Sequence, residues 1–246
     1  MHLDASGSNA IHVACRYGHQ DVVEILLGAG LPTDLLDTDG NSVLSIAAMN
    51  GHASSVELLL QYGASIDLSS NDGITALMRA SAYGHANVVL VLLEHLANSN
   101  LHEHQVGKTA LHTACYWRYV DVVECLLENG AMIDSVDGHG CTSLLCASQY
   151  GHIGVVKTLL KYSPSIDLAD HDGDSPLIVA AMEGHTRVVQ LLIEHNADVE
   201  LANNVGVTPL IIAAQNGHKE VVKLLLDAGA SIGFQDPNGN AALRVP

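Results

Sequence analysis

Histidine is the residue in this sequence with the clearest potential for chemistry, because it can bind metals and transfer protons near neutral pH. The chain has 15 histidines among 246 residues. His95, His102 and His104 lie close together in sequence, and Glu103 stands between two of them. Such residues can bind zinc, but a surface loop provides no preformed ligand geometry. A zinc site is therefore the weaker interpretation of this cluster, and the sequence predicts no metal and no cofactor.

Other patterns with catalytic or metal-binding potential fail in their details. The segment 170–174 resembles the start of a calcium-binding loop, but its glycine is misplaced and the required distal glutamate is missing. The sequence contains no phosphate-binding loop, no G-x-S-x-G pattern and no H-E-x-x-H pattern. We therefore predict that the chain is not an enzyme.

Many of the other histidines follow a glycine and recur at a step of 33 residues, with one step of 34 along the chain. The histidines of this series are His19, His52, His85, His152, His185 and His218. A second glycine series runs with the same period from Gly7 to Gly239, and its step of 34 lies between Gly73 and Gly107. A fixed period of this length is typical of stacked repeats. We therefore interpret the glycine–histidine pairs as structural.

The segment 206–229 indicates which elements one period contains. Thr208 can cap a first helix, Pro209 suits its first position, and Gly217 can end it. A second amphipathic helix follows and ends at Gly229. Each helix has only about 8–10 residues, which is too few for stability in water without packing. The unit must therefore stack on copies of itself.

This repeat resembles the ankyrin repeat, whose pattern is T-P-L-H, then A-A, G-H and V-V-x-x-L-L. The segments 108–112 (KTALH) and 175–177 (SPL) are further matches. The resemblance implies an all-α solenoid of stacked antiparallel helix pairs with β-hairpin-like loops between the repeats. It also implies that His12 and His112 bridge neighbouring backbones. We expect a single domain over residues 4–246, with repeats at about 4–36, 37–69, 70–102, 103–136, 137–169, 170–202 and 203–235 and a partial eighth at 236–246.

The departures from this pattern concentrate between Leu96 and Tyr119. Leu96 stands where the second helix normally ends on a glycine, although a branched side chain disfavours positive φ. The segment 96–106 also contains the extra residue. Arg118 and Tyr119 replace the usual glycine–histidine pair. Ser163 and Asn196 replace the later glycine in repeats five and six.

Composition limits the classes of partner and the location. A net charge of −17 argues against nucleic acid, because phosphate binding relies on a basic surface. The longest apolar runs, such as Leu177–Met182, are too short to span a membrane. No secretory signal is recognised at the N-terminus. We therefore predict a cytoplasmic protein, with the nucleus as the alternative. Its cysteines are interpreted as core residues in a reducing compartment, and they are Cys15, Cys115, Cys125, Cys141 and Cys146.

In ankyrin stacks, the hairpin tips and the last two residues of the first helix line a concave groove that binds partners. Here those positions hold four of the seven tyrosines and the only tryptophan. Exposed Tyr, Trp, Arg and Met are enriched in interface hot spots. We therefore predict a scaffold that binds a protein or an extended peptide, without a small-molecule cofactor. The predicted binding residues are Arg16, Tyr17, Met49, Asn50, Arg79, Tyr83, Tyr116, Trp117, Arg118, Gln149, Tyr150, Met182 and Glu183.

The character of the partner is suggested by the charges along this surface. Arg16, Arg79 and Arg118 lie near its N-terminal part, which favours acidic and aromatic or proline residues over repeats one to four. Acidic residues around Glu183 favour basic residues over repeat six. An aromatic cage for methylated lysine, around Trp117 and Tyr150, ranks lower because its nearest acid is one repeat further on.

Two alternative functions remain open. No polar capping repeat is recognised at either end, so the chain is expected to be cut from something longer or covered by something else. It could then be the recognition arm of a longer ligase adaptor, channel or enzyme. A largely structural spacer is the other alternative, and the aromatic positions argue against it.

The ankyrin resemblance also implies a modification. Intracellular ankyrin repeats resemble known substrates of an asparaginyl hydroxylase that acts on an asparagine in the hairpin segment. The corresponding positions are Asp34, Asp67, Asn100, Asp134, Asp167, Glu200 and Gly233. Only Asn100 carries the amide, and it lies in the irregular segment, where the chain could open. We therefore predict hydroxylation at Asn100.

Overall fold

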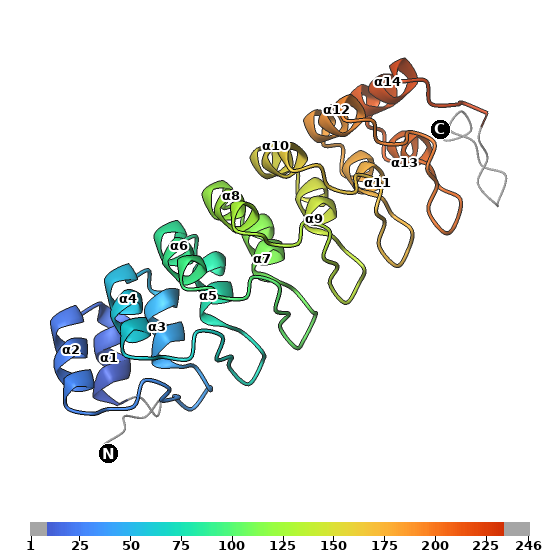
Figure 1. The fold of residues 1–246 in the computed structure, drawn as a ribbon. Coiled ribbons are helices and arrows are strands. Elements are labelled where there is room, and N and C mark those ends of the chain that lie inside the picture. The colour runs from blue at the N-terminus through green and yellow to red at the C-terminus, as the bar shows by residue number, and fades with distance from the viewer. Residues whose placement is uncertain (1–8, 234–246) are drawn as a thin grey trace. The chain divides into compact units, whose positions relative to one another are not determined.

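The computed structural model describes residues 9–233, and within them it forms fourteen helices in seven pairs and no strand (Figure 1). The expected domain start at residue 4 and the expected partial eighth repeat at 236–246 lie outside these residues. Isolated antiparallel bridges, Leu36 with Ser42 and Val136 with Thr142, close two of the loops between pairs. The predicted all-α solenoid of paired helices with hairpin-like loops is confirmed.

The chain divides into two compact units, residues 1–132 and 133–246. In unit 1, each first helix packs on the next first helix and each second helix on the next second helix. The loops that precede α3, α5 and α7 project to the same side of the unit (Figure 1). The helices of unit 1 are α1 (Ala10–Tyr17), α2 (Gln20–Gly28), α3 (Val43–Met49), α4 (Ala53–Gln61), α5 (Ala76–Ala82), α6 (Ala86–Glu94), α7 (Ala110–Tyr116) and α8 (Val120–Glu128).

Unit 2 repeats the same arrangement over three pairs. Its first helices α9 (Ser143–Gln149), α11 (Pro176–Met182) and α13 (Pro209–Gln215) pack on one another in order. Its second helices α10 (Ile153–Lys161), α12 (Thr186–Glu194) and α14 (Lys219–Asp227) do the same. Each pair therefore buries its apolar sides against its neighbours within the unit, as a stack requires.

Each first helix begins at a polar cap. The Thr208 hydroxyl accepts a hydrogen bond from the Ile211 backbone N–H, and Pro209 is the first helical residue, as predicted. Such caps satisfy backbone donors that the helix leaves unpaired, and each contributes about 1 kcal/mol. The corresponding caps of the other first helices are Asn9, Ser42, Thr75, Thr109, Thr142 and Ser175.

The core contains apolar residues that recur at equivalent positions from pair to pair. Leu59, Leu92 and Leu126 are fully buried at equivalent positions of successive second helices in unit 1. Among the cysteines, Cys15 and Cys115 are fully buried and the other three are half-buried, and none of the five forms a disulfide within residues 9–233. Burial raises the pKa of Cys15 to about 12, which makes it an inert core residue. No helix between residues 9 and 233 is long and apolar enough to cross a lipid bilayer.

The irregular positions in the sequence do not interrupt the helix pairs. Leu96 adopts a left-handed φ of 67°, close to the φ of 86° at Gly63, which ends the preceding second helix. Ser163 and Asn196 also adopt positive φ, at 53° and 66°. The turn is therefore kept despite its local cost, because packing of the flanking helices determines the backbone there.

The extra residue lies in the hairpin between Glu103 and Lys108. In the two preceding hairpins the closing backbone hydrogen bond spans four residues, for example from the Asp37 N–H to the Asn41 carbonyl at 3.0 Å. In this hairpin it spans five, from the Glu103 N–H to the Lys108 carbonyl at 3.0 Å. The insertion is thus confined to a loop tip and leaves α6 and α7 unchanged in length.

The Glu103 carboxylate fills this larger tip. It accepts backbone N–H groups from Gln105 at 2.7 Å, Val106 at 2.8 Å and Lys108 at 3.2 Å. Partial burial alone would raise the pKa of Glu103, but backbone donors, including that of Gly107, outweigh it and hold that pKa below its ordinary value. Glu103 is therefore a loop-ordering residue.

Candidate functional site

The glycine–histidine pairs hold the ends of the first helices in place. In unit 1 the His52 Nε2–H donates to the Arg16 carbonyl at 3.1 Å, and the His85 Nε2–H donates to the Met49 carbonyl at 3.0 Å. The acceptors lie at the end of the first helix in the preceding pair: Arg16 is the next-to-last residue of α1, and Met49 is the last residue of α3. The backbone at these positions is thus satisfied within the stack, and the side chains there are left to form the surface.

The same bridge occurs in unit 2. His185 donates to the Gln149 carbonyl at 3.0 Å, and His218 donates to the Met182 carbonyl at 2.9 Å. His12 lies 3.3 Å from the Leu35 carbonyl, and His112 forms a capping box with Thr109. The structural interpretation is confirmed for His12 and for the four bridging histidines His52, His85, His185 and His218. The bridge that the resemblance implies for His112 stays a prediction.

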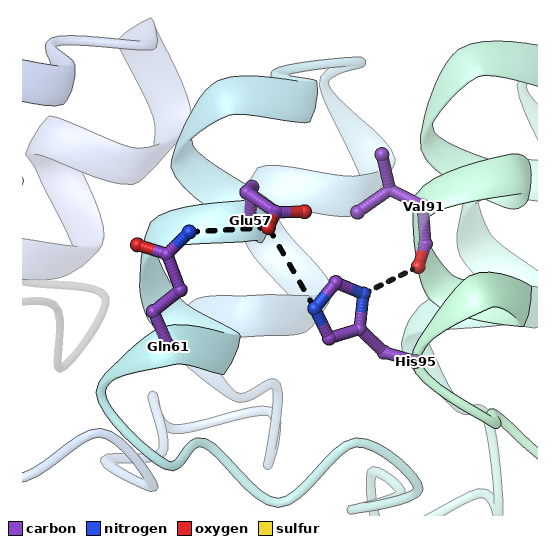
Figure 2. A network of polar contacts seen from close by, with 4 residues as sticks. All are labelled: Glu57, Gln61, Val91 and His95. Carbon is purple, nitrogen blue, oxygen red and sulfur yellow. Dashed lines mark hydrogen bonds and ion pairs between the residues drawn. The ribbon is translucent and has the colours of Figure 1, made fainter.

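The three histidines of the irregular segment do not come together. His95 Nδ1 lies 2.9 Å from the Val91 carbonyl, and its Nε2 lies 3.7 Å from the Glu57 carboxylate (Figure 2). The same carboxylate accepts a hydrogen bond from the Gln61 amide at 3.1 Å. His104 instead packs over Gly73 in the preceding hairpin. Within residues 9–233, no group of three or more His, Cys, Asp or Glu side chains is arranged to hold a metal ion.

We call the exposed ends of the first helices in unit 1 the helix-end surface. Tyr17, Tyr83 and Trp117 are its most exposed aromatic residues, at 65%, 53% and 55%. Tyr17 and Tyr83 stack on the histidines two residues later, with ring centroids 6.1 Å and 6.3 Å apart. The predicted residues at these ends are Arg16, Tyr17, Met49, Asn50, Tyr83, Tyr116, Trp117 and Arg118, and we include Arg79, which is half-buried in the middle of α5.

Most of the remaining non-aromatic residues of this surface are less exposed. Arg16, Met49 and Asn50 are half-buried, and the Asn50 amide donates to the Ile46 carbonyl at 2.8 Å. Arg118 is exposed and has a left-handed φ of 66° at the usual glycine position. The aromatic residues therefore provide most of the accessible apolar area.

Two neighbouring pairs of unit 1 line an open pocket of about 360 Å³ on this surface. Its lining consists of Arg79, Ala82 and Tyr83 from one pair and Trp117 and Tyr119 from the next. Tyr119 is not at a position that the ankyrin resemblance assigns to the surface. In the sequence, Tyr119 stands out because it replaces the histidine that the other repeats carry. This replacement was recognised as an irregularity, but no pocket was predicted from it.

Unit 2 has its own helix-end residues. Tyr150 is 47% exposed and stacks on His152 at 5.9 Å, and Gln149 beside it is exposed. Met182 is half-buried and Glu183 is exposed. The unit 2 surface therefore combines one aromatic residue with polar and acidic neighbours.

Comparison with known families and structures assigns the chain. A family model described as ankyrin repeats (3 copies) matches residues 11–103, 96–170 and 163–236, which together cover most of the chain. The chain belongs to the ankyrin repeat family. Ankyrin repeat domains are generally protein–protein interaction modules.

Solved structures of ankyrin repeat domains resemble the chain closely. The ankyrin repeat domain of Bcl-3, described as a unique member of the IkappaB protein family, is 27% identical with a TM-score of 0.82, over 90% of this chain and 99% of that one. The human ASB11 ankyrin repeat domain is 28% identical with a TM-score of 0.81, over 91% of this chain and 99% of that one. A search of curated protein sequences found no match.

The position predicted for hydroxylation belongs to a series of contacts between ankyrin repeats. In unit 1, Asp34, Asp67 and Asn100 each accept the backbone N–H of a residue in the next repeat, at 2.8 Å, 3.0 Å and 2.8 Å. The donor to Asn100 is Met132. Asn100 is half-exposed, so its amide oxygen is engaged while part of the side chain remains accessible.

Acidic side chains order the hairpin tips of unit 2. Asp170 accepts backbone N–H groups from Asp172 at 3.0 Å and Asp174 at 2.9 Å, as in a hairpin and not in a calcium loop. Burial raises the pKa of Asp174; a hydrogen bond from Asn203 opposes this, and the charges of Asp170 and Asp172 add to it. These carboxylates therefore act mainly on loop structure.

Proposed function

We propose that this ankyrin repeat chain is a non-enzymatic interaction module, which binds a protein or an extended peptide through the groove that the helix-end residues line. The observation that carries the proposal is the exposure of Tyr17, Tyr83 and Trp117 at equivalent places in different repeats. Tyr83 and Trp117 lie on neighbouring pairs and line one pocket, and monomeric proteins seldom expose a large contiguous apolar patch that has no function. Interface hot spots are enriched in these residue types.

Rigidity of the surface supports the same proposal. The helix ends that carry Arg16 and Met49 are held by histidine bridges, and Tyr116 packs edge-on against Trp117 at 5.1 Å. A partner therefore meets side chains whose backbone is already fixed. Preorganisation of this kind reduces the entropic cost of association.

The net charge and the cysteines support the class of partner and the location that we propose. The net charge of −17 opposes nucleic-acid binding, so the partner in this proposal is a protein. Five cysteines that form no disulfide in the described part of the chain fit the reducing conditions of the cytoplasm or nucleus.

The test compares wild type with Trp117→Ala and Tyr83→Ala as baits in pull-downs, followed by calorimetry on the captured partner. Each truncation should weaken binding by about 2 kcal/mol or more, which is roughly 30-fold. Tyr62→Ala is the matched control, because Tyr62 is 45% exposed but ends the second helix α4. Wild-type affinity in both surface variants would reject this surface, and a spacer function predicts that no specific partner is captured.

A further inference from the structure

The pocket between α5 and α7 arises where the chain departs from its own repeat. At the position of Tyr119, the other six pairs carry a histidine. Four of these histidines pack over the glycine that follows the first helix of the preceding pair, and they are His52, His85, His185 and His218. A Cβ at Gly51 would lie 2.8 Å from the His85 ring, and a Cβ at Gly84 would lie 2.6 Å from the Tyr119 ring. Tyr119 therefore occupies the histidine's place but presents a larger phenol ring to the pocket.

The pocket has aromatic walls. Tyr83, Trp117 and Tyr119 line it together with Ala82, and its volume of about 360 Å³ is at the lower end of the roughly 300–1,000 Å³ of ligand pockets. That size suits one large side chain. Aromatic rings gain from offset or edge-to-face packing with one another beyond their buried area. An aromatic side chain is therefore the best-matched apolar guest.

The charged group at the pocket is Arg79. Its Nη2–H donates to the Asn41 side-chain oxygen at 3.1 Å, whereas its buried Nε has no hydrogen-bond partner. In the part of the chain that the structure describes, Arg79 forms no ion pair, and no acidic residue lines the pocket. A guanidinium has five N–H donors matched to carboxylates, so most of its capacity is unused.

A second cation lies close to the same aromatic group. The Lys108 ammonium is 5.2 Å from the centroid of Tyr116, which packs against Trp117. Arg79 at the pocket and Lys108 beside its aromatic group are thus two cations on an otherwise acidic chain. This charge disfavours a methylated lysine or another cationic guest, because an aromatic cage for a cation gains from a nearby carboxylate and loses from a nearby guanidinium.

We propose that the pocket of Arg79, Ala82, Tyr83, Trp117 and Tyr119 receives an aromatic side chain of an extended partner segment, and that an acidic residue beside it pairs with Arg79. This inference rests on the proposed function and names the partner's chemistry at one place. The aromatic ring packs against Trp117 and Tyr83. The carboxylate accepts hydrogen bonds from the accessible N–H groups of the guanidinium.

The test selects random dodecapeptides displayed on phage against the full chain, and synthesises the enriched peptides. Trp117 is the only tryptophan in the sequence, so its fluorescence reports occupancy of the pocket directly. Enriched peptides should carry an acidic residue next to an aromatic one. Replacing that acid by its amide should weaken binding to wild type about tenfold or more, but should leave binding to Arg79→Gln nearly unchanged.

Two further variants separate charge from shape. Arg79→Lys should retain most of the preference for acid, and Tyr119→His, which restores the repeat's own residue, should weaken the aromatic contact without unfolding the chain. Circular dichroism checks the fold of each variant. Peptides that alter Trp117 emission but prefer basic residues, or show no preference for acid, would overturn this inference and leave the proposed function standing. Peptides that bind Trp117→Ala as tightly as wild type would overturn both.

Discussion

Substitution of Leu96 can measure the free energy that a non-glycine residue costs in the turn after a second helix. The residue ends α6 with a φ of 67°, and its side chain is 86% exposed. An L-residue with a side chain pays about 1–2 kcal/mol in this conformation. Replacing Leu96 with glycine removes that cost and almost no buried contact.

The expected gain is smaller than the strain itself. Glycine makes the unfolded chain more flexible, which costs about 0.5–1 kcal/mol on folding. Subtracting this from the relieved strain leaves Leu96→Gly more stable than wild type by about 0.5–1 kcal/mol. Gly130 provides the reverse experiment, since it has the same role after α8 with a φ of 84°, and a Cβ there meets no atom within 4 Å. Gly130→Leu should lose a similar amount.

Urea unfolding followed by far-ultraviolet circular dichroism measures these differences from the transition midpoints at constant slope. Leu96→Ala is the control, because alanine removes the side chain but keeps the strained backbone, and it should be close to wild type. If Leu96→Ala were as stabilising as Leu96→Gly, exposure of the leucine and not backbone strain would be the cause. If Leu96→Gly were destabilising, the reasoning about this turn would be wrong.

Further expectations concern buried and modified side chains. Ser148 is fully buried in α9 with an unpaired hydroxyl, and three other repeats have alanine at this position (Ala48, Ala181 and Ala214), so Ser148→Ala should raise the free energy of unfolding by about 1 kcal/mol in urea titrations. The pKa of Asp174 is raised above its ordinary 3.8 by burial and by the neighbouring carboxylates, so the stability that its protonation contributes is present at low pH and is lost as the pH rises through the folded pKa. Asp174→Asn should therefore exceed wild type in thermal stability at pH 7, and the advantage should disappear near pH 3; an advantage that persists there would point to another cause. Asn100 should gain one oxygen atom when the chain is incubated with an active asparaginyl hydroxylase, as measured by peptide mass spectrometry with Asn100→Asp as the unmodified control, and an unmodified wild-type peptide would count against the site.

The architecture could be predicted from the sequence because the interactions that determine it lie within one helix or join neighbouring repeats. A cap such as Thr208, a proline at Pro209 and a glycine such as Gly217 each act within one helix, so their order predicts the helices. The 33-residue period then implies stacking, because helices this short are unstable alone. The histidines of the glycine–histidine pairs follow the same period, which is why the sequence predicted a structural role for them. The bridges of His52, His85, His185 and His218 confirm that role.

What only the tertiary structure decided is which side chains from different repeats meet. The sequence shows that Trp117 and Tyr83 hold equivalent positions of their repeats. Whether they form one pocket with Arg79 depends on how the two pairs pack on each other. His95 turned toward Glu57 on the preceding second helix and not toward its sequence neighbours (Figure 2). Such contacts join residues more than 30 positions apart, and the direction of each side chain is set by the packing of the pairs. The repeat period alone carries no information about that direction.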